Sequence, residues 1–260
     1  MTIETELNQI IAILEAEIPA NPLSPKNLKL RGKLELKLAK YFKNLEQAFP
    51  YSKLSGIYNK YVKESIGSDS GNILDPILAT FHDALAKEMA GELSTVYTSG
   101  QAEMITYGKT KLGIPIAYEG PPVKQAIDWA EKHGAQLVTQ MDEETKRRLA
   151  KVVSDGIKNK RGVPGLERDL RATFSDMKKF RSTMIARTET ADALSQASLD
   201  TMKDMGIDGK EVVGNDPCEI CQANIADGVI PVNQAFSSGD MAPPFHPNCE
   251  CALAPAILKK

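Results

Sequence analysis

The side chains best suited to chemistry in this sequence lie close to its C-terminal end. All four cysteines of the 260 residues fall between positions 218 and 251. Cys218 and Cys221 form a Cys-x-x-Cys pair, and 24 residues separate this pair from His246, Cys249 and Cys251. A Cys-x-x-Cys turn lets two thiolates approach one tetrahedral ion, and a distant segment supplies the remaining ligands. We therefore predict one structural Zn²⁺ per chain, with five candidate ligands for about four positions.

Other uses of these cysteines are less consistent with the sequence. Two disulfides would need an oxidising compartment, and a redox pair at Cys218 and Cys221 would need a strand before it and a helix after it. A catalytic zinc would keep an open position beside a general base, for which Glu219 and Glu250 are the nearest carboxylates. The ligand set is already sufficient without an open position, so a structural role is favoured.

A second motif, Arg187-Thr188-Glu189-Thr190, lies within a predicted helix. Its small neighbours would let another element approach closely. Residues two apart on a helix do not meet, so Arg187 and Glu189 must have different partners. We expect these side chains to hold the C-terminal tail or a neighbouring helix. The alternative is an enzyme, a transferase or zinc hydrolase, that uses Arg187 and Glu189 or the metal.

Charge is unevenly distributed although the formal net charge is only −2. Residues 26–63 contain ten Lys or Arg against two Glu, and residues 146–181 contain twelve against four acidic residues. Each stretch is about +8. Such stretches can contact double-stranded DNA or an acidic protein surface, and they can equally be solvated helix faces.

The first two-thirds of the chain has the apolar spacing of helices. We expect helices at about 5–17, 28–49, 51–66, 75–107, 123–134, 142–159, 164–174 and 176–205, and a short strand at 210–213. Prolines and glycines at 113–122 mark the best boundary between two helical parts. The fold class is therefore mainly α, with a small irregular/β tail after residue 206.

The tail, rich in Gly, Pro, Asn and Asp, cannot form a large core by itself, so we expect the metal to organise it. A DNA-reading zinc finger would place a recognition helix between its ligand pairs. The glycines and prolines between Cys221 and His246 make such a helix improbable. The sequence shows neither a membrane-spanning segment nor a signal peptide, so we expect folding in a cytosol and no membrane partner.

Several motifs, taken in order, resemble one protein family. They are the segment from Ala126 to Gly134 followed by Leu137-Val138, Gly162-Val-Pro-Gly165, Ile185-Ala-Arg-Thr-Glu-Thr190, Cys218-x-x-Cys221 and Pro244-Phe-His-Pro-Asn-Cys-Glu-Cys251. This order is similar to the phage Mu F-like head morphogenesis, or minor head protein, family over residues 123–257. One departure is Glu250, where the family usually has a basic residue.

The resemblance implies a non-enzymatic minor capsid protein of a tailed phage or prophage. Such a protein binds the portal and other head proteins during procapsid assembly, and helps DNA packaging or delivery. It would occur first in the host cytoplasm and then in the virion. The implied domains are a helical region at 1–120 and a Mu F-like domain at 121–260, with the zinc knuckle at about 210–257.

Overall fold

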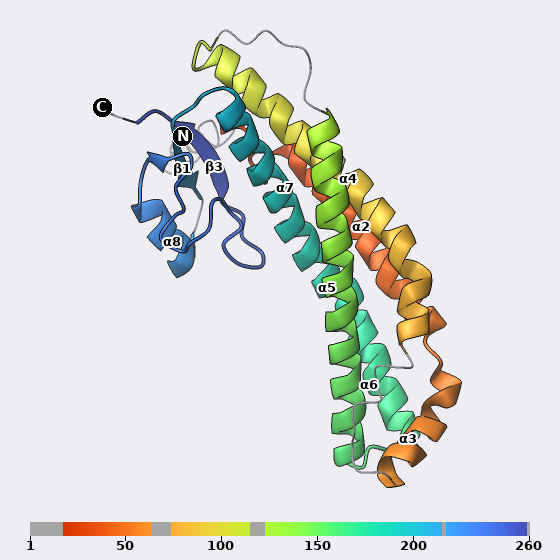
Figure 1. Ribbon diagram of the computed structural model, residues 1–260. Helices are drawn as coiled ribbons and strands as arrows, with labels where there is room; N and C mark the ends of the chain where they lie inside the picture. Colours follow the sequence, from red (N-terminus) through yellow and green to blue (C-terminus); the bar gives the residue numbers. More distant parts are fainter. Residues whose placement is uncertain (1–17, 64–73, 115–122, 215–216, 259–260) are drawn as a thin grey trace, which may run out of the picture. The chain divides into compact units, whose positions relative to one another are not determined.

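The structure, a computed structural model, describes residues 18–63, 74–114, 123–214 and 217–258. It is mainly helical with a small antiparallel sheet near the C-terminus (Figure 1). This confirms the predicted fold class. The helix expected at 5–17 lies outside the described residues. None of the helices within them has the length and apolar composition needed to cross a bilayer.

Helices make up most of the described chain. In order they are α2 (Pro25–Ala48), η1 (Tyr51–Lys53), α3 (Leu54–Lys63), α4 (Asp75–Thr110), α5 (Val123–Lys158), α6 (Gly162–Asp176), the π-helical η3 (Met177–Arg181) and α7 (Ser182–Asp204). Their contacts divide the chain into two compact units. Unit 1 contains residues 1–34, 91–130 and 184–260, and unit 2 contains residues 35–90 and 131–183.

Two predicted helix breaks are absent from the structure. The helices expected at 123–134 and 142–159 are one helix, α5, because Leu137, Val138 and Met141 continue its buried face through the expected gap. The break expected near Asp176 is also wrong, since η3 joins α6 to α7 without leaving helical backbone angles. A widened π turn inserts a residue without ending a helix, and apolar periodicity does not reveal it.

Within unit 2, small residues let two helices approach closely. A Cβ atom at Gly134 of α5 would lie 3.1 Å from the backbone nitrogen of Ala90 in α4 and 3.4 Å from the carbonyl oxygen of Ala86. The helix therefore contains a glycine for a packing reason, despite the lower helix propensity of glycine. This contact explains why α5 continues through a residue that the sequence suggested as an end.

Polar groups in the same unit are buried in pairs. The hydroxyl of Tyr41 donates to Asp142 over 2.6 Å, and the other oxygen of Asp142 lies 2.8 Å from Nδ1 of His82. Arg181 of η3 is 5% exposed and donates to the Thr145 hydroxyl and the Met141 carbonyl. Burial lowers the pKa of Arg181 to about 10, which still leaves it charged at neutral pH.

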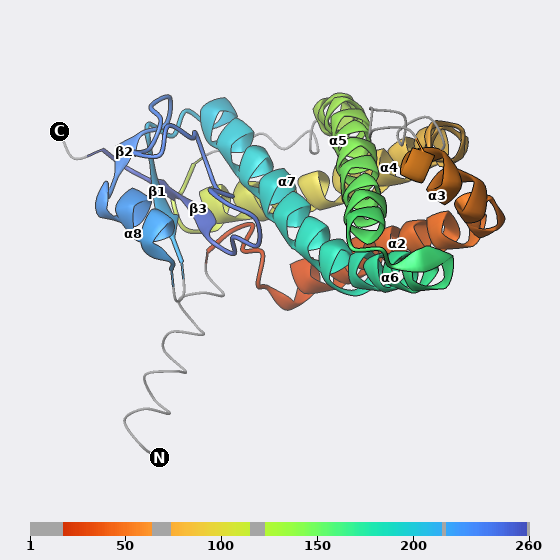
Figure 2. The ribbon, with the colours of Figure 1, turned by 90° about the horizontal axis from the view of Figure 1, so that it is seen from below.

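The tail folds around three strands and a short helix, all within unit 1. The strands are β1 (Gly209–Val213), β2 (Ile230–Pro231) and β3 (Ala252–Ala256), in the order β2-β1-β3, and both pairings are antiparallel. The strand predicted at 210–213 is therefore confirmed. The helix α8 (Glu219–Ala226), which the sequence did not indicate, lies beside the sheet (Figure 2).

The packing at Gly134 can be tested against a glycine that contacts nothing. Gly134→Leu should lower the stability of the protein by about 1–3 kcal/mol because the two helix backbones must separate. Gly32, within α2, has no atom within 4 Å of its virtual Cβ. Gly32→Ala should therefore raise stability by about 0.5–1 kcal/mol. Urea denaturation followed by circular dichroism measures both, and a neutral Gly134→Leu variant would contradict the close approach.

Candidate metal centre

The Cys-x-x-Cys pair is positioned by the start of α8. Cys218 is the N-cap residue of this helix, and its carbonyl accepts a hydrogen bond from the backbone nitrogen of Gln222 over 2.8 Å. A hydrogen bond from the backbone of Cys221 holds the pKa of the Cys218 thiol below its usual value. A thiolate is the form that binds metal. The turn therefore presents Cys218 as a ready ligand, exposed at the protein surface.

His246 brings its imidazole to this pair from a distant part of the chain. Its Nε2 lies 3.2 Å from the sulfur of Cys218 and 3.1 Å from the sulfur of Cys221. Its Nδ1 lies 2.8 Å from the carbonyl oxygen of Pro247, which can only accept a hydrogen bond. Nδ1 therefore carries the proton in this arrangement, and the lone pair of Nε2 points to the two sulfurs.

Cys221 belongs to a second group of donors as well. Its sulfur lies 3.7 Å from that of Cys249, and the sulfurs of Cys221, Cys249 and Cys251 all lie within 4.8 Å of one another. All three residues are buried. A hydrogen bond from Cys251 lowers the pKa of Cys249 to about 5, whereas burial raises the pKa of Cys221 to about 12. The five predicted residues thus form two groups that share Cys221.

The distances suit a tetrahedral ion. With Zn–S bonds of about 2.3 Å and Zn–N bonds of about 2.0–2.1 Å, ligand atoms are separated by about 3.8 Å for two sulfurs and about 3.6 Å for sulfur and nitrogen. The Cys221–Cys249 distance of 3.7 Å matches the first value. The imidazole lies a few tenths of an ångström closer to its two sulfurs than the second. The spacings within each group therefore suit a tetrahedral ion, and a single ion with four ligands would require the two groups to move closer together.

The sheet holds the two ligand-bearing segments together. β1 and β3 pair with Val213 opposite Ala252, so Gly214 and Cys251 follow as neighbours at the end of the ladder. A Cβ atom at Gly214 would lie 2.7 Å from the sulfur of Cys251. Only glycine therefore leaves space for this sulfur. The two segments that carry the candidate ligands therefore meet at this end of the sheet.

The predicted Arg-Thr-Glu-Thr motif is partly at this site. The hydroxyl of Thr188 accepts a hydrogen bond from the backbone nitrogen of Asn248 over 3.1 Å. Glu250, between two of the cysteines, lies 3.0 Å from the guanidinium of Arg31 and 3.8 Å from that of Arg187. Arg187 and Thr188 thus contact the turn that carries the ligands, as expected of residues that hold the tail.

The other two residues of the motif differ from these. Glu189 is half-buried on α7. Thr190 is fully buried, and its hydroxyl has no hydrogen-bond partner among the described residues. Sequence reasoning missed Arg31, which is 219 residues from Glu250 along the chain. Arg31 belongs to the basic stretch at 26–63, but nothing in the sequence indicates Glu250 as its partner.

A buried lysine supports the loop that precedes the ligands. Lys210 of β1 is 0% exposed, donates to the carbonyl of Met241 over 2.7 Å, and lies 5.1 Å from the centre of the Phe236 ring. Burial lowers its pKa to about 8. The hydrogen bond from Lys210 holds the loop at Met241, and burial of the ammonium group costs free energy because the charge loses its hydration.

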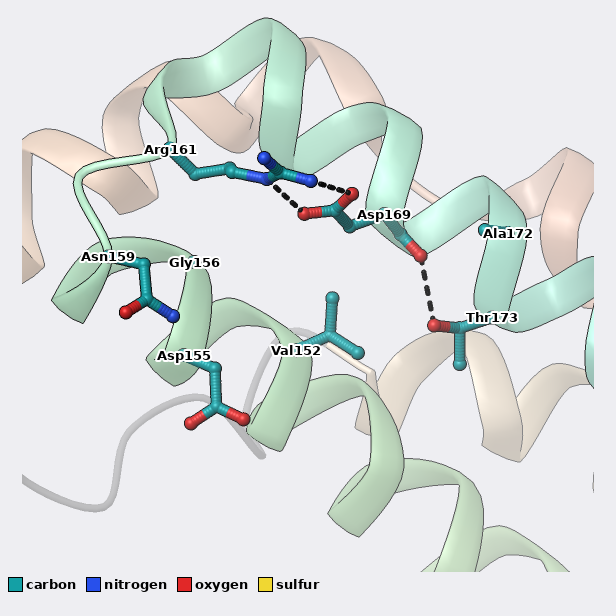
Figure 3. Close-up of a pocket in the computed structure, with 8 residues that line it drawn as sticks. All are labelled: Val152, Asp155, Gly156, Asn159, Arg161, Asp169, Ala172 and Thr173. Atoms are coloured by element: carbon teal, nitrogen blue, oxygen red, sulfur yellow. Dashed lines mark hydrogen bonds and ion pairs between the residues drawn. The ribbon is translucent and has the colours of Figure 1, made fainter.

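A hollow of about 510 Å³ lies elsewhere, between the end of α5 and α6 in unit 2 (Figure 3). Its charged groups are already paired. Arg161 donates twice to Asp169, at 2.8 and 3.2 Å, and Asp155 accepts from Lys151 over 2.7 Å. Since these pairs satisfy one another, the hollow offers no evident reactive group.

Most of the predicted basic stretch at 146–181 is paired in the same way. Seven of its twelve cations form ion pairs: Lys146, Arg147, Arg148, Lys151, Arg161, Arg171 and Lys178. An eighth, Arg181, is buried. The stretch therefore offers far fewer cations to a polyanion than its sequence charge suggests.

Comparisons of the chain with protein-family models, with curated proteins and with solved structures find no match. The interpretation of the site therefore depends on its geometry and on the motifs themselves.

Burial of Lys210 predicts a pH dependence of stability. Its pKa is about 8 when folded and near 10.5 in the unfolded chain, so the unfolded state binds more protons between these values. Stability should therefore rise with pH from about 8 to about 10, by about 2 kcal/mol. Lys210→Met should lack this rise.

Lys29, exposed on α2, provides the matched control. Lys29→Met should keep the full rise in stability. Chemical denaturation at a series of pH values, with zinc present so that the thiolates do not titrate, measures the difference between the variants. Parallel curves for the protein and Lys210→Met would show that the lysine is not desolvated.

Proposed function

We propose that this chain is a minor head protein of a tailed phage or prophage, with a C-terminal region closed by one structural Zn²⁺. The observation that carries the proposal is the contact between the Arg-Thr-Glu-Thr helix and the cysteine-bearing turn. Thr188 binds the backbone of Asn248, and Arg187 lies near Glu250. The motifs on which the family resemblance depends are thus neighbours in space as well as in order.

Within this proposal the zinc is held by Cys218, Cys221, His246 and Cys249. Cys249 is chosen as the fourth ligand because its sulfur lies at the zinc-compatible distance of 3.7 Å from Cys221. Cys251 then lies in the outer shell, packed against Gly214. Bound zinc supplies no chemistry here beyond cross-linking, because four protein ligands leave no position for water or substrate. This favours a structural role over the alternative of a zinc hydrolase.

The proposed partners are the portal protein and other head proteins, met in the host cytoplasm and retained in the virion. Glu250 affects which side of the cysteine-bearing turn is open to such a partner. Where the family usually has a basic residue, this acidic side chain is engaged by two arginines of its own chain. The knuckle turn is therefore directed inward at this position. Contact with double-stranded DNA would depend on cations outside the internal ion pairs.

The ligand assignment predicts a specific order among cysteine variants. The purified protein should contain about one zinc per chain, measured by elemental analysis. Cys221→Ser and Cys249→Ser should lose it, whereas Cys251→Ser should keep it. Cobalt substitution provides a second measurement, because the intensity of the thiolate-to-metal absorption counts the sulfur ligands. Three thiolates are expected.

Two results would contradict this part of the proposal. Zinc retained by Cys249→Ser but lost from Cys251→Ser would exchange the roles of these residues. A protein that is purified without zinc, and whose unfolding followed by circular dichroism is the same with added zinc and with a chelator, would exclude a structural zinc.

The head-assembly role has a separate test. The chain should co-purify with the portal protein encoded in the same genome when the two are produced together, and particles made without the chain should be defective in assembly or DNA content. A double Arg187→Ala, Glu189→Ala variant whose tail still folds and binds zinc should keep portal binding and particle assembly. Loss of either function should accompany altered folding of the tail. If the zinc region at about 210–257 is deleted and portal binding does not change, the partner surface lies elsewhere in the chain.

A further inference from the structure

The five donors of the candidate metal centre divide into two groups of three. One group consists of Cys218, Cys221 and His246, and the other consists of Cys221, Cys249 and Cys251. Within each group the ligand atoms all lie within 4.8 Å of one another. Among the described residues, no four of these donors meet that criterion together. The centre is thus arranged as two three-donor groups, and both groups contain the sulfur of Cys221.

Zinc and monovalent copper differ in the number of ligands that they require. Structural zinc is almost always tetrahedral, so one zinc ion needs donors from both groups to close around it. Cu⁺ is a soft ion that thiolates bind preferentially, and about three of them complete its coordination. A group of three donors is therefore sufficient for Cu⁺ but one ligand short for zinc.

The second group is buried among apolar side chains. Cys221, Cys249 and Cys251 are 2%, 1% and 5% exposed, and they belong to one apolar cluster with residues such as Val212 and Leu253. Zinc bound by these three thiolates alone would have to recruit a fourth ligand into this cluster. Buried water is stable only where it has several polar partners. An ion that three sulfurs satisfy suits these surroundings better.

The first group contains an imidazole whose free lone pair is directed to two sulfurs. Nε2 of His246 lies 3.2 Å from the sulfur of Cys218 and 3.1 Å from that of Cys221, and Nδ1 lies 2.8 Å from the carbonyl oxygen of Pro247. With bonds of about 2.0–2.3 Å, donors around a planar three-coordinate ion are about 3.8–4.0 Å apart. An ion would therefore separate the imidazole from the sulfurs by about half an ångström. Cys218 is exposed, so its side chain has space for this displacement.

The sulfur of Cys221 connects the two groups. It lies 3.7 Å from the sulfur of Cys249 and 3.1 Å from Nε2 of His246. A thiolate has more than one lone pair, so one sulfur can bind two ions at the same time. Two divalent ions on one sulfur would repel each other about four times as strongly as two monovalent ions at the same separation. A shared sulfur therefore favours monovalent ions.

We propose that the five donors bind two Cu⁺ ions, one in each group, with the thiolate of Cys221 as the bridge between them. This inference rests on the donor cluster of the proposed function, and it gives that cluster a second occupant that replaces zinc. Zinc requires the two groups to move together, whereas two Cu⁺ ions use the groups separately. The cysteine thiols release their protons to solvent on binding, and no electron is transferred because copper enters as Cu⁺.

Cys251 distinguishes the two metals. In the zinc assignment above it lies in the outer shell, whereas in the copper-bound chain it is one of three ligands of the buried ion. Cys251→Ser should therefore keep its zinc. The same variant should bind the buried Cu⁺ ion more weakly by over about 100-fold, beyond the usual effect of an outer-shell partner.

The test titrates the full chain, as purified and under anaerobic conditions, with Cu⁺ in the presence of a competing Cu⁺ chelator of known affinity. Two copper ions per chain are expected, measured by the absorbance of the chelator complex. The bound zinc should be released as copper binds, measured with a zinc-sensitive dye. X-ray absorption of the copper-loaded chain should show three-coordinate copper with a second copper close by, as a shared sulfur requires.

Two histidine variants provide a matched comparison. His246→Gln removes a donor of the first group, and His82→Gln removes an imidazole that belongs to neither group. His82 lies in unit 2, whereas all five donors lie in unit 1. His246→Gln should bind one of the two ions more weakly, and His82→Gln should bind both as the unmodified chain does. Circular dichroism checks that each variant folds, and zinc retained by Cys251→Ser shows that its tail is intact.

Three results would overturn the proposal. They are a limit of one Cu⁺ per chain, no neighbouring copper in the X-ray absorption of the loaded chain, and Cys251→Ser that holds both ions as tightly as the unmodified chain. Any of them, found with one zinc bound per chain, would leave the structural zinc of the proposed function in place. Two Cu⁺ ions bound by a chain that takes up no zinc would support this inference and contradict the zinc assignment.

Discussion

The antiparallel pairing of β1 with β3 determines whether the cysteines can act together. β1 ends just before the Cys-x-x-Cys turn, and β3 begins directly after Cys251. Their register places Gly214 against the sulfur of Cys251. A shift of the register by one residue would reverse the faces of β3 and move this sulfur away from the site. The backbone hydrogen bonds of a five-residue strand therefore set the geometry of the ligand group.

The tail does not depend on metal alone. Its buried side chains, among them Val212, Ile230 and Phe236, pack in one cluster with Met104 of α4 and with Met202 of α7. The sequence suggested that the tail lacks a core of its own, and the structure shows that it shares the core of unit 1. Zinc in small modules contributes about 10–16 kcal/mol. Here that energy would add to an existing apolar contact, so the metal-free tail should retain part of its packing.

The sequence was informative wherever the determining contacts are local. Apolar periodicity identified most helices and the strand at 210–213, and the spacing of Cys218, Cys221 and His246 predicted a group of donors that the structure brings within 4.8 Å of one another. The prediction that a helix ends at Gly134 was wrong, because this glycine is needed for close packing against the α4 backbone, more than forty residues away along the chain. It failed similarly for α8, whose short length gives periodicity little to act on. Nothing in the sequence indicated that Arg31 pairs with Glu250 either, because the two residues are 219 positions apart.

The same distinction explains why charge counts mislead. Two stretches had about the same charge in the sequence, yet in one of them most cations have a carboxylate partner within ion-pair distance, usually three to eight residues away. An exposed pair of this kind contributes at most about 1 kcal/mol to stability, but it neutralises the field that a polyanion would sense. On α2 the acidic residues lie on the flank that meets η3, and the charged residues of the outward face are lysines. The arrangement of acids around a helix, more than the net charge of a segment, therefore decides which face can attract a partner.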